Sequence, residues 1–271
     1  MRALIGSIIK SNELFKFIKN HDKIMVGVSG GKDSTLLFYA LTLYAKMMKE
    51  KNNWDIKVYG YHVKINFYEN KYDDYLKWMS DHGLEVKIIE SNVADILKAK
   101  AKNNKVICSL CAKMKKAILV KEAKKLKCNK IAMAHHIDDA IETLFLNMIY
   151  EGRIATFSPN MYMDRSKMWL IRPFVLVSEK EIIRTKNRLQ VPIITNACPN
   201  ETTTKRTYLK YFLEQNFYEN KNFNNCYNNF KNSLINGKQS YLWFNSNKNT
   251  NKDFLKIINY GKLSQIKKIK K

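Results

Sequence analysis

The sequence predicts an α/β protein with a doubly wound, mainly parallel, Rossmann-like sheet. From residue 23 to about residue 200, short runs rich in β-branched residues alternate with segments of helical periodicity, the rhythm of βαβ units. The chain has only 9 glycines and 4 prolines, too few for a many-turned β-sandwich. With 271 residues, 45% of them hydrophobic, it is long enough to bury one large core.

Residues 1–22 place apolar side chains at helical spacing and predict an N-terminal amphipathic helix. Residues 23–200 form the expected core domain, with a capping-box pattern from Ser178 to Glu181 before its last helix. The strands of this domain are expected in the runs KIMVGV, IKVYGYHV, EVKII, NKIAMA and MWLIRP. Its helices are expected at 35–51, at 72–82, from Cys111, at 138–150 and from Ser178, with a loop over 151–167.

The composition changes after Cys198. A helix is expected at 205–215, and the remaining sequence is rich in Lys and Asn. We therefore expect residues 201–271 to be a small helical C-terminal appendage with a basic tail, residues 267–271.

The charge balance favours a polyanionic partner. The chain carries 48 Lys and Arg against 24 Asp and Glu, a net charge of +24. Nucleic acid or an anionic surface is the first expectation, and a generic lysine-rich surface is the alternative. No stretch is apolar enough to span a bilayer and no cleavage site follows the N-terminal helix, so we expect a cytoplasmic protein that uses no membrane.

A glycine-rich loop follows the first strand. Residues 29–34 read Ser-Gly-Gly-Lys-Asp-Ser and lead directly into a helix, so backbone N–H groups and the helix N-terminus can bind phosphate. The spacing is neither that of a Walker P-loop nor that of a Rossmann GxGxxG fingerprint. The alternative is a tight strand-to-helix turn, which would not require the Lys, the Asp and the two serines.

A second polar constellation, residues 135–143, follows the strand that ends at Ala134. It reads His-His-Ile-Asp-Asp-Ala-Ile-Glu-Thr and lies at the carboxyl end of a strand, the same sheet edge as the phosphate loop. Helical capping by acidic residues is the alternative interpretation. Periodicity predicts a buried stripe on the helix that follows, made of Ile141, Leu144, Phe145, Met148 and Ile149.

The chain contains five cysteines. Cys108 and Cys111 form a CxxC pair before a lysine-rich helix, and Cys198 precedes Pro199. A zinc site, a redox dithiol and a three-thiolate iron–sulfur cluster all fit this pattern, and incidental thiols are the alternative, which we apply to Cys128 and Cys226.

These motifs together carry a family resemblance. SGGKDS resembles the PP-loop of the ATP pyrophosphatase superfamily, whose fold is that of the adenine nucleotide alpha hydrolases. The segment 135–143 resembles its GHxxDDxxET motif, with Ala134 in place of Gly. CSLC before a helix, RPF at 172–174 and the late Cys198-Pro199 are similar to the tRNA 2-thiolation enzymes, over about residues 10–215. Within that group the chain looks most like the tRNA 2-thiocytidine synthetases, although those usually carry a second CxxC where this chain has Cys198 alone.

The resemblance implies roles for individual residues. Lys115, Asp139 and Asp33 would be catalytic, with Asp139 binding Mg²⁺. A [4Fe–4S] cluster would be held by Cys108, Cys111 and Cys198. ATP would be bound by the following residues: Val28, Ser29, Gly30, Gly31, Lys32, Asp33, Ser34, His62, Ala134 and His135.

The implied reaction is ATP-dependent thiolation of tRNA. AMP is transferred to the C2 oxygen of a pyrimidine, expected to be cytidine, and sulfur then displaces the AMP. The sulfur would come from a cysteine desulfurase persulfide or from free sulfide, and the resemblance implies a homodimer. The alternatives are 2-thiouridine synthesis, a tRNA-isoleucine lysidine synthetase, which would need no cysteines, and a non-catalytic zinc-stabilised RNA-binding module.

Overall fold

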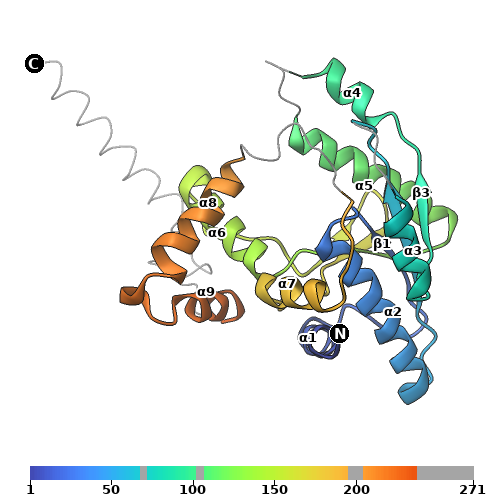
Figure 1. Ribbon diagram of the computed structural model, residues 1–271, viewed down its shortest axis with the longest axis horizontal. Helices are drawn as coiled ribbons and strands as arrows, with labels where there is room; N and C mark the ends of the chain where they lie inside the picture. The colour runs from blue at the N-terminus through green and yellow to red at the C-terminus, as the bar shows by residue number, and fades with distance from the viewer. Residues whose placement is uncertain (68–71, 102–106, 195–203, 237–271) are drawn as a thin grey trace, which may run out of the picture. The chain divides into compact units, whose positions relative to one another are not determined.

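The computed structural model describes residues 1–67, 72–101, 107–194 and 204–236. Its sheet has six strands in the order β3-β2-β1-β4-β6-β5, and all neighbours are parallel except β5 and β6 (Figure 1). The predicted α/β fold with a mainly parallel sheet is therefore confirmed. The strands are β1 (Lys23–Gly27), β2 (Lys57–Val63), β3 (Val86–Ile89), β4 (Lys130–Ala132), β5 (Asn160–Met163) and β6 (Met168–Ile171).

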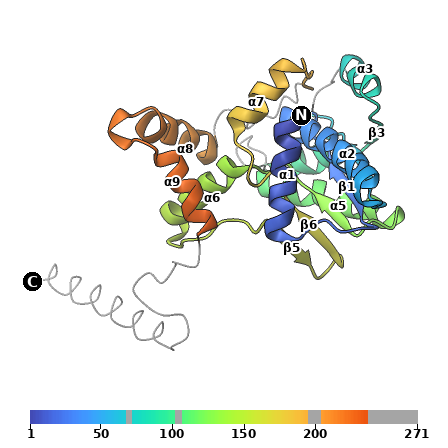
Figure 2. The same ribbon diagram turned by 90° about the horizontal axis from the view of Figure 1, so that it is seen from below.

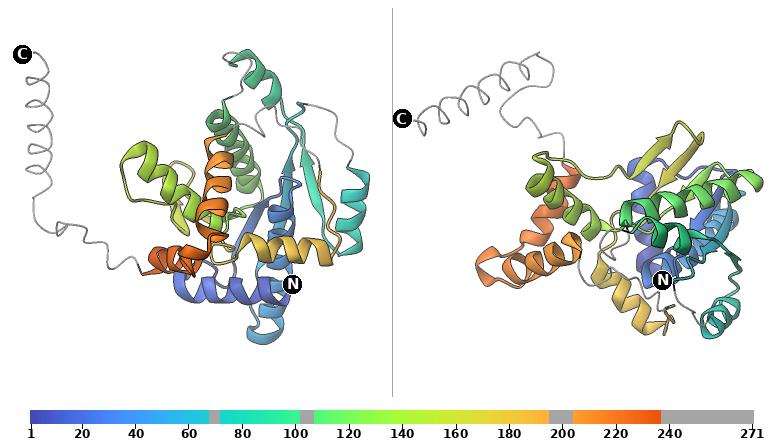
Figure 3. Two further views of the ribbon diagram at one scale, coloured as in Figure 1. Left: turned by 60° about the vertical axis from the view of Figure 1, so that its left-hand side comes forward. Right: turned by 90° about the horizontal axis from the view of Figure 1, so that it is seen from above.

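Helices cover both faces of this sheet (Figure 3). Side chains of α1, α2, α3 and α7 share one hydrophobic cluster with the sheet, and those of α5 belong to a second cluster with it. In chain order the helices up to α8 are α1 (Arg2–Phe15), α2 (Lys32–Asn52), α3 (Asp73–Asp81), α4 (Val93–Ala99), α5 (Cys108–Lys125), α6 (Ile137–Glu151), α7 (Glu179–Arg188) and α8 (Lys205–Leu213). A π-helical turn, Glu214–Tyr218, continues α8.

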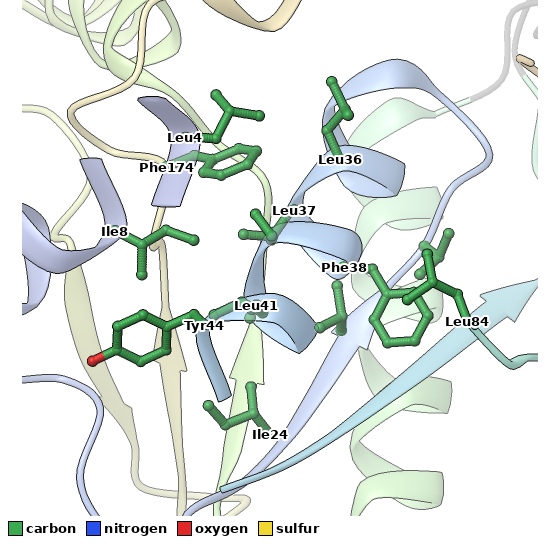
Figure 4. Packing of buried hydrophobic residues seen from close by; sticks show 14 of the residues in the cluster. Leu4, Ile8, Ile24, Leu36, Leu37, Phe38, Leu41, Tyr44, Leu84 and Phe174 are labelled. Atoms are coloured by element: carbon green, nitrogen blue, oxygen red, sulfur yellow. The ribbon is translucent and has the colours of Figure 1, made fainter. Parts of the chain in front are cut away.

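The larger core lies between the sheet and the helices α1 and α2, which run side by side (Figure 2). Leu4 and Ile8 of α1 are fully buried with Leu37 and Leu41 of α2 (Figure 4). Burying such a side chain stabilises the fold by roughly 2 kcal/mol. This packing fixes the start of α2, and hence the loop before it, relative to β1.

The strand order places the polar motifs together. From β1 the chain proceeds to β2 and β3 on one side and later to β4 and β6 on the other, so the order reverses between β1 and β4. In an open parallel sheet the crevice at such a reversal, outside the carboxyl ends of the strands, is where ligands bind. The phosphate loop, residues 29–34, follows β1, and the polar segment 135–143 follows β4, so both lie at this edge of the sheet.

Several predictions about elements were wrong. The helix expected from Cys111 begins at Cys108, so the CxxC pair lies in its first turn rather than before it, and α4 was not predicted. The segment 151–167, expected to be a loop, contains β5, which closes an antiparallel hairpin with β6. The last two residues of the stripe expected to be buried on α6 are exposed, Met148 by 46% and Ile149 by 58%. Instead Glu142, near the start of α6, is buried. The buried residues of α6 all lie in its first half, so periodicity alone misplaced its buried face.

The chain divides into two compact units, Met1–Glu219 and Asn220–Lys271. The described part of the second unit holds the short 3₁₀ helix Lys221–Phe223 and the helix α9 (Cys226–Ile235). The basic tail expected at 267–271 lies outside the described residues. In the described ranges, no helix has the length and apolar character needed to cross a membrane.

Candidate functional site

The phosphate loop is held by its own serines. Ser34 Oγ accepts the backbone N–H of Ser29 at 2.9 Å and lies 3.0 Å from Ser29 Oγ. Gly30 has φ +84°, and a Cβ there would meet Ile194 Cδ1 at 2.6 Å, so only glycine fits this position. Gly31 caps α2, whose first N–H groups have no partner within the helix. The loop therefore presents donors and a helix N-terminus to an anion.

Lys32, at the first position of α2, lies in an acidic setting. Its Nζ is 3.3 Å from Asp33 Oδ1 and 3.1 Å from Glu179 Oε1 at the start of α7. Burial opposes the charge on this lysine, but Asp33 and Glu179 outweigh it and raise the pKa of Lys32. Lys32 is thus a fixed cation beside the loop.

The first turn of α6 links the second motif to the first. Asp139 Oδ2 accepts the backbone N–H of His136 at 3.0 Å, and Asp138 Oδ2 accepts that of Glu179 at 2.8 Å. Burial opposes the charge on His136, but the carboxylates of Asp138 and Asp139 raise its pKa. The acidic pair therefore serves as more than a helix cap, since Asp138 also fixes the start of α7 and, through Glu179, the position of Lys32.

A cation from α8 reaches the same acidic turn. Arg206 Nη1 lies 3.0 Å from Glu142 Oε2 and 3.4 Å from Asp139 Oδ1, and Nη2 donates to Thr143 Oγ1 at 2.9 Å. Burial raises the pKa of Glu142 to about 7, although Arg206 opposes this shift. These contacts pack α8 against α6 (Figure 1).

His135 is kept neutral at the end of β4. Burial, together with the charge of Arg172, lowers the pKa of His135 to about 4. Arg172 stacks over the ring of Phe157 at 4.7 Å and donates to the carbonyl oxygen of Ser158. Phe157 in turn contacts the imidazole of His135. Arg172, from the RPF sequence, therefore positions the aromatic wall beside His135.

One pocket joins the phosphate loop to the CxxC helix. It has a volume of about 380 Å³ and is lined by the ends of β1, β2 and β4 and by α5. Burial lowers the pKa of His62, and its Nδ1 lies 2.8 Å from the carbonyl oxygen of Val28, to which the neutral ring donates. The predicted site residues in its lining are Val28, Ser29, His62, Cys111, Lys115 and His135.

The two described cysteines of the predicted cluster open α5. Cys108 is exposed, and Cys111, one turn later, is half-buried in the pocket wall. A helix N-terminus favours the thiolate form of a cysteine. Cys198 lies outside the described residues, and within the described part of the chain no group of three or more His, Cys, Asp or Glu side chains is arranged to hold a metal ion.

The structure thus groups the predicted residues into two neighbouring sets. One lines the pocket with Cys111 and Lys115. The other contains the ion pair of Lys32 with Asp33, and Asp139, which is connected to Lys32 indirectly through His136, Asp138 and Glu179. Ala134 packs beside the larger core at the end of β4. Sequence reasoning missed Asp138, Glu142, Glu179, Arg206 and Lys210 as site residues. The acids of 138–142 were visible in the motif, but nothing local indicated that α7 and α8 would reach it.

A parallel sheet with an anion-binding loop after its first strand and an acidic helix start after β4 defines an α/β nucleotide-binding protein. The family model described as the PP-loop domain matches residues 6–216. The chain belongs to this PP-loop family, and the predicted resemblance is confirmed.

Curated relatives extend the comparison. The chain is 36% identical over 217 residues to a protein named tRNA-cytidine(32) 2-sulfurtransferase from Actinobacillus pleuropneumoniae serotype 7 (strain AP76), a match covering 79% of this chain and 65% of that protein. It is 36% identical over 218 residues to a protein of the same name from Histophilus somni (strain 2336), covering 79% and 67% of the two chains. The match thus spans about two thirds of the length of these relatives.

A solved structure shares the fold. The U34-tRNA thiolase NcsA from Methanococcus maripaludis, determined with its [4Fe–4S] cluster, superposes with a TM-score of 0.63 at 22% identity, covering 87% of this chain and 78% of that one. At this identity the likeness concerns the fold.

Proposed function

We propose that the protein is an ATP-dependent tRNA sulfurtransferase that converts a cytidine of tRNA to 2-thiocytidine. One observation carries the proposal: a single pocket is lined both by the end of the nucleotide loop, Val28 and Ser29, and by Cys111 and Lys115 of the CxxC helix. An ATP-activated group and a thiolate-bound sulfur can meet in such a pocket. The names of the curated relatives support cytidine as the target.

ATP is proposed to bind with its phosphates at the loop 29–34 and its base near His62. Lys32 and the first N–H groups of α2 would stabilise the departing pyrophosphate. The residues fit a divalent cation, because Asp139 and Glu142 already share one positive group, Arg206 Nη1. Mg²⁺ bound at Asp139 would neutralise the charge of the phosphates.

The cysteines are proposed to hold a [4Fe–4S] cluster. Cys108 and Cys111 fit as ligands, because they lie one turn apart at a helix N-terminus and Cys111 faces the pocket. Cys198 is the proposed third ligand. When bound by three thiolates, such a cluster offers an open iron that keeps hydrosulfide deprotonated.

The remaining chemistry is assigned to side chains of the pocket. The C2 oxygen of the base takes AMP from ATP, pyrophosphate leaves, and sulfur then forms the C2–S bond as the C2–O bond to AMP breaks. Lys115, in the pocket wall, would stabilise the negative charge of the departing AMP. His135, kept neutral by burial, would provide a hydrogen-bonding wall without adding charge.

The partners follow from the reaction and the charge. Lysines of α5, with the net charge of +24, would bind tRNA phosphates in the cytoplasm. The sulfur source would be a cysteine desulfurase persulfide or free sulfide. We further propose a homodimer, which sedimentation of the purified protein would test.

Coupled product analysis tests the proposed function. Anaerobically prepared protein receives unmodified tRNA, ATP and sulfide, and AMP and thiolated nucleoside are both quantified. We expect equal amounts of AMP and 2-thiocytidine. Thiolation without AMP formation would refute the proposal, as would AMP formation with lysine attached to the base instead of sulfur when free lysine is supplied together with sulfide. Asp164→Asn, a change of charge in the β5–β6 turn, serves as the control and should leave both products unchanged.

A further inference from the structure

Helix α8 delivers two cations to acidic groups of the nucleotide site. Arg206 contacts Asp139 and Glu142 on α6, at 3.4 and 3.0 Å. Lys210, one turn later on the same face of α8, lies 2.6 Å from Glu179 Oε2. The other oxygen of Glu179 is the partner of Lys32.

Both carboxylate oxygens of Asp139 are occupied in this arrangement. Oδ2 accepts the backbone N–H of His136 at 3.0 Å, and Oδ1 faces Arg206 Nη1 at 3.4 Å. The contact with Arg206 is the longer one, and Arg206 is 42% exposed while Asp139 is 23% exposed. The guanidinium is therefore the weaker of the two partners of Asp139, and its charge would be solvated on leaving, although its contacts with Glu142 at 3.0 Å and Thr143 at 2.9 Å would also have to break.

Glu142 makes a positive group favourable at this position. Its side chain is only 8% exposed and lies on the same helix turn as Asp139. Two nearby carboxylates in a partly buried setting repel each other, so either Glu142 takes up a proton, as its pKa of about 7 allows, or a positive group neutralises the pair. Arg206 supplies positive charge to both carboxylates when no divalent cation is bound, and the imidazole of His136 lies 3.5 Å from Asp139 Oδ2 on the other side.

We propose that Arg206 is the resident counter-ion of Asp139 and Glu142, which the divalent cation accompanying ATP must displace before it can bind Asp139. The inference rests on the proposed function only in taking Asp139 as the metal ligand. Arg206 is thereby a positioning residue: it sets the affinity of the acidic pair for metal and holds α8 against α6 in the unloaded protein.

Binding of Mn²⁺ alone tests the inference without ATP, tRNA or sulfur. Free Mn²⁺ is titrated by electron paramagnetic resonance against the full chain and against Arg206→Gln. Because removal of a competing cation leaves the two carboxylates uncompensated, the variant should bind Mn²⁺ about tenfold more tightly. Arg206→Lys, which keeps the charge but loses the forked geometry, should give an intermediate affinity.

Tyr208→Ala provides the matched control on the same helix. Tyr208 is 70% exposed and its loss should leave Mn²⁺ affinity unchanged. Circular dichroism reports whether each variant folds. If Arg206→Gln binds Mn²⁺ no more tightly than wild type, the inference is overturned. Should the glutamine variant unfold, Arg206→Lys takes its place, and a Mn²⁺ affinity no higher than that of wild type overturns the inference.

Thiolation assays keep the two proposals separable. Wild-type protein that thiolates tRNA, combined with unchanged Mn²⁺ affinity in Arg206→Gln, contradicts this inference alone. Tighter Mn²⁺ binding by the variant, combined with no thiolation by the wild type, supports the counter-ion role and contradicts the proposed function.

Discussion

Lys32 and Glu179 form an ion pair, Nζ to Oε1 at 3.1 Å, that joins the start of α2 to the start of α7. The two residues are far apart in sequence, and their pairing gives the phosphate loop a carboxylate at the position where an anionic ligand would approach Lys32.

Glu179→Gln is expected to strengthen the binding of inorganic pyrophosphate severalfold. The substitution keeps the shape of the side chain but removes the negative charge that engages Lys32 in the ligand-free protein. Isothermal titration with pyrophosphate measures the effect. Lys32→Ala removes the cation itself, so the rate at which ATP is converted to AMP should fall by a factor of about 10²–10³. Weaker pyrophosphate binding by Glu179→Gln would show that the orientation of Lys32 by this carboxylate outweighs its competition with the ligand.

Gly30→Ala is expected to destabilise the protein by about 2 kcal/mol. The residue has φ +84°, and an added Cβ would meet the side chain of Ile194 at 2.6 Å. Urea unfolding measures the change. Gly31→Ala is the matched comparison, because its added Cβ would meet only Ser29 Oγ, at 3.6 Å. Equal loss of stability in both variants would contradict the loop conformation described.

Cys108→Ala and Cys111→Ala are each expected to lose most of the bound iron after anaerobic preparation. Their thiolates open α5 and supply two of the proposed cluster ligands. Cys128→Ala is the control, since burial raises the pKa of Cys128 to about 11 and it packs in the second hydrophobic cluster. Iron and sulfide analysis gives the answer. Full iron content in both α5 variants, or zinc in place of iron, would remove the cluster from the site.

His135 is expected to make the protein less stable in mild acid. Burial lowers its pKa to about 4 in the folded protein, from an ordinary value of 6.5. As the pH falls from 6.5 towards 4, His135 takes up a proton in the unfolded chain but not in the folded protein. The free energy of unfolding therefore falls, by as much as about 3 kcal/mol. His135→Gln should reduce this loss, as measured by urea unfolding at pH 7.5 and pH 5. An identical pH dependence in the variant would contradict a neutral, buried imidazole.

Local patterns predicted most of the fold. Ser178 caps α7 as the capping box indicated, with its Oγ accepting the N–H of Glu181 at 3.3 Å, and the N-terminal helix appears as α1. Such features depend on neighbours within a turn. The hairpin strand β5 was missed because a short edge strand has little apolar periodicity and is defined by its pairing with β6.

The motifs of the site could be predicted from the sequence, but the contacts that α7 and α8 make with them could not. The phosphate loop and the acidic turn of α6 could be identified from residues adjacent in sequence. The contacts of Glu179 with Lys32 and of Arg206 with Asp139 depend on how α7 and α8 pack, which no local signal encodes. Met148 and Ile149 illustrate the same limit, since helical spacing could not indicate where the covering of α6 ends.

Mass spectrometry of tRNA nucleosides tests the central proposal most directly. Cells lacking this protein are complemented with the wild type, with Lys115→Ala, or with an empty vector, and total tRNA is digested and analysed. We predict 2-thiocytidine with the wild type and its loss in the other two. Equal 2-thiocytidine in all three strains would contradict the proposed function.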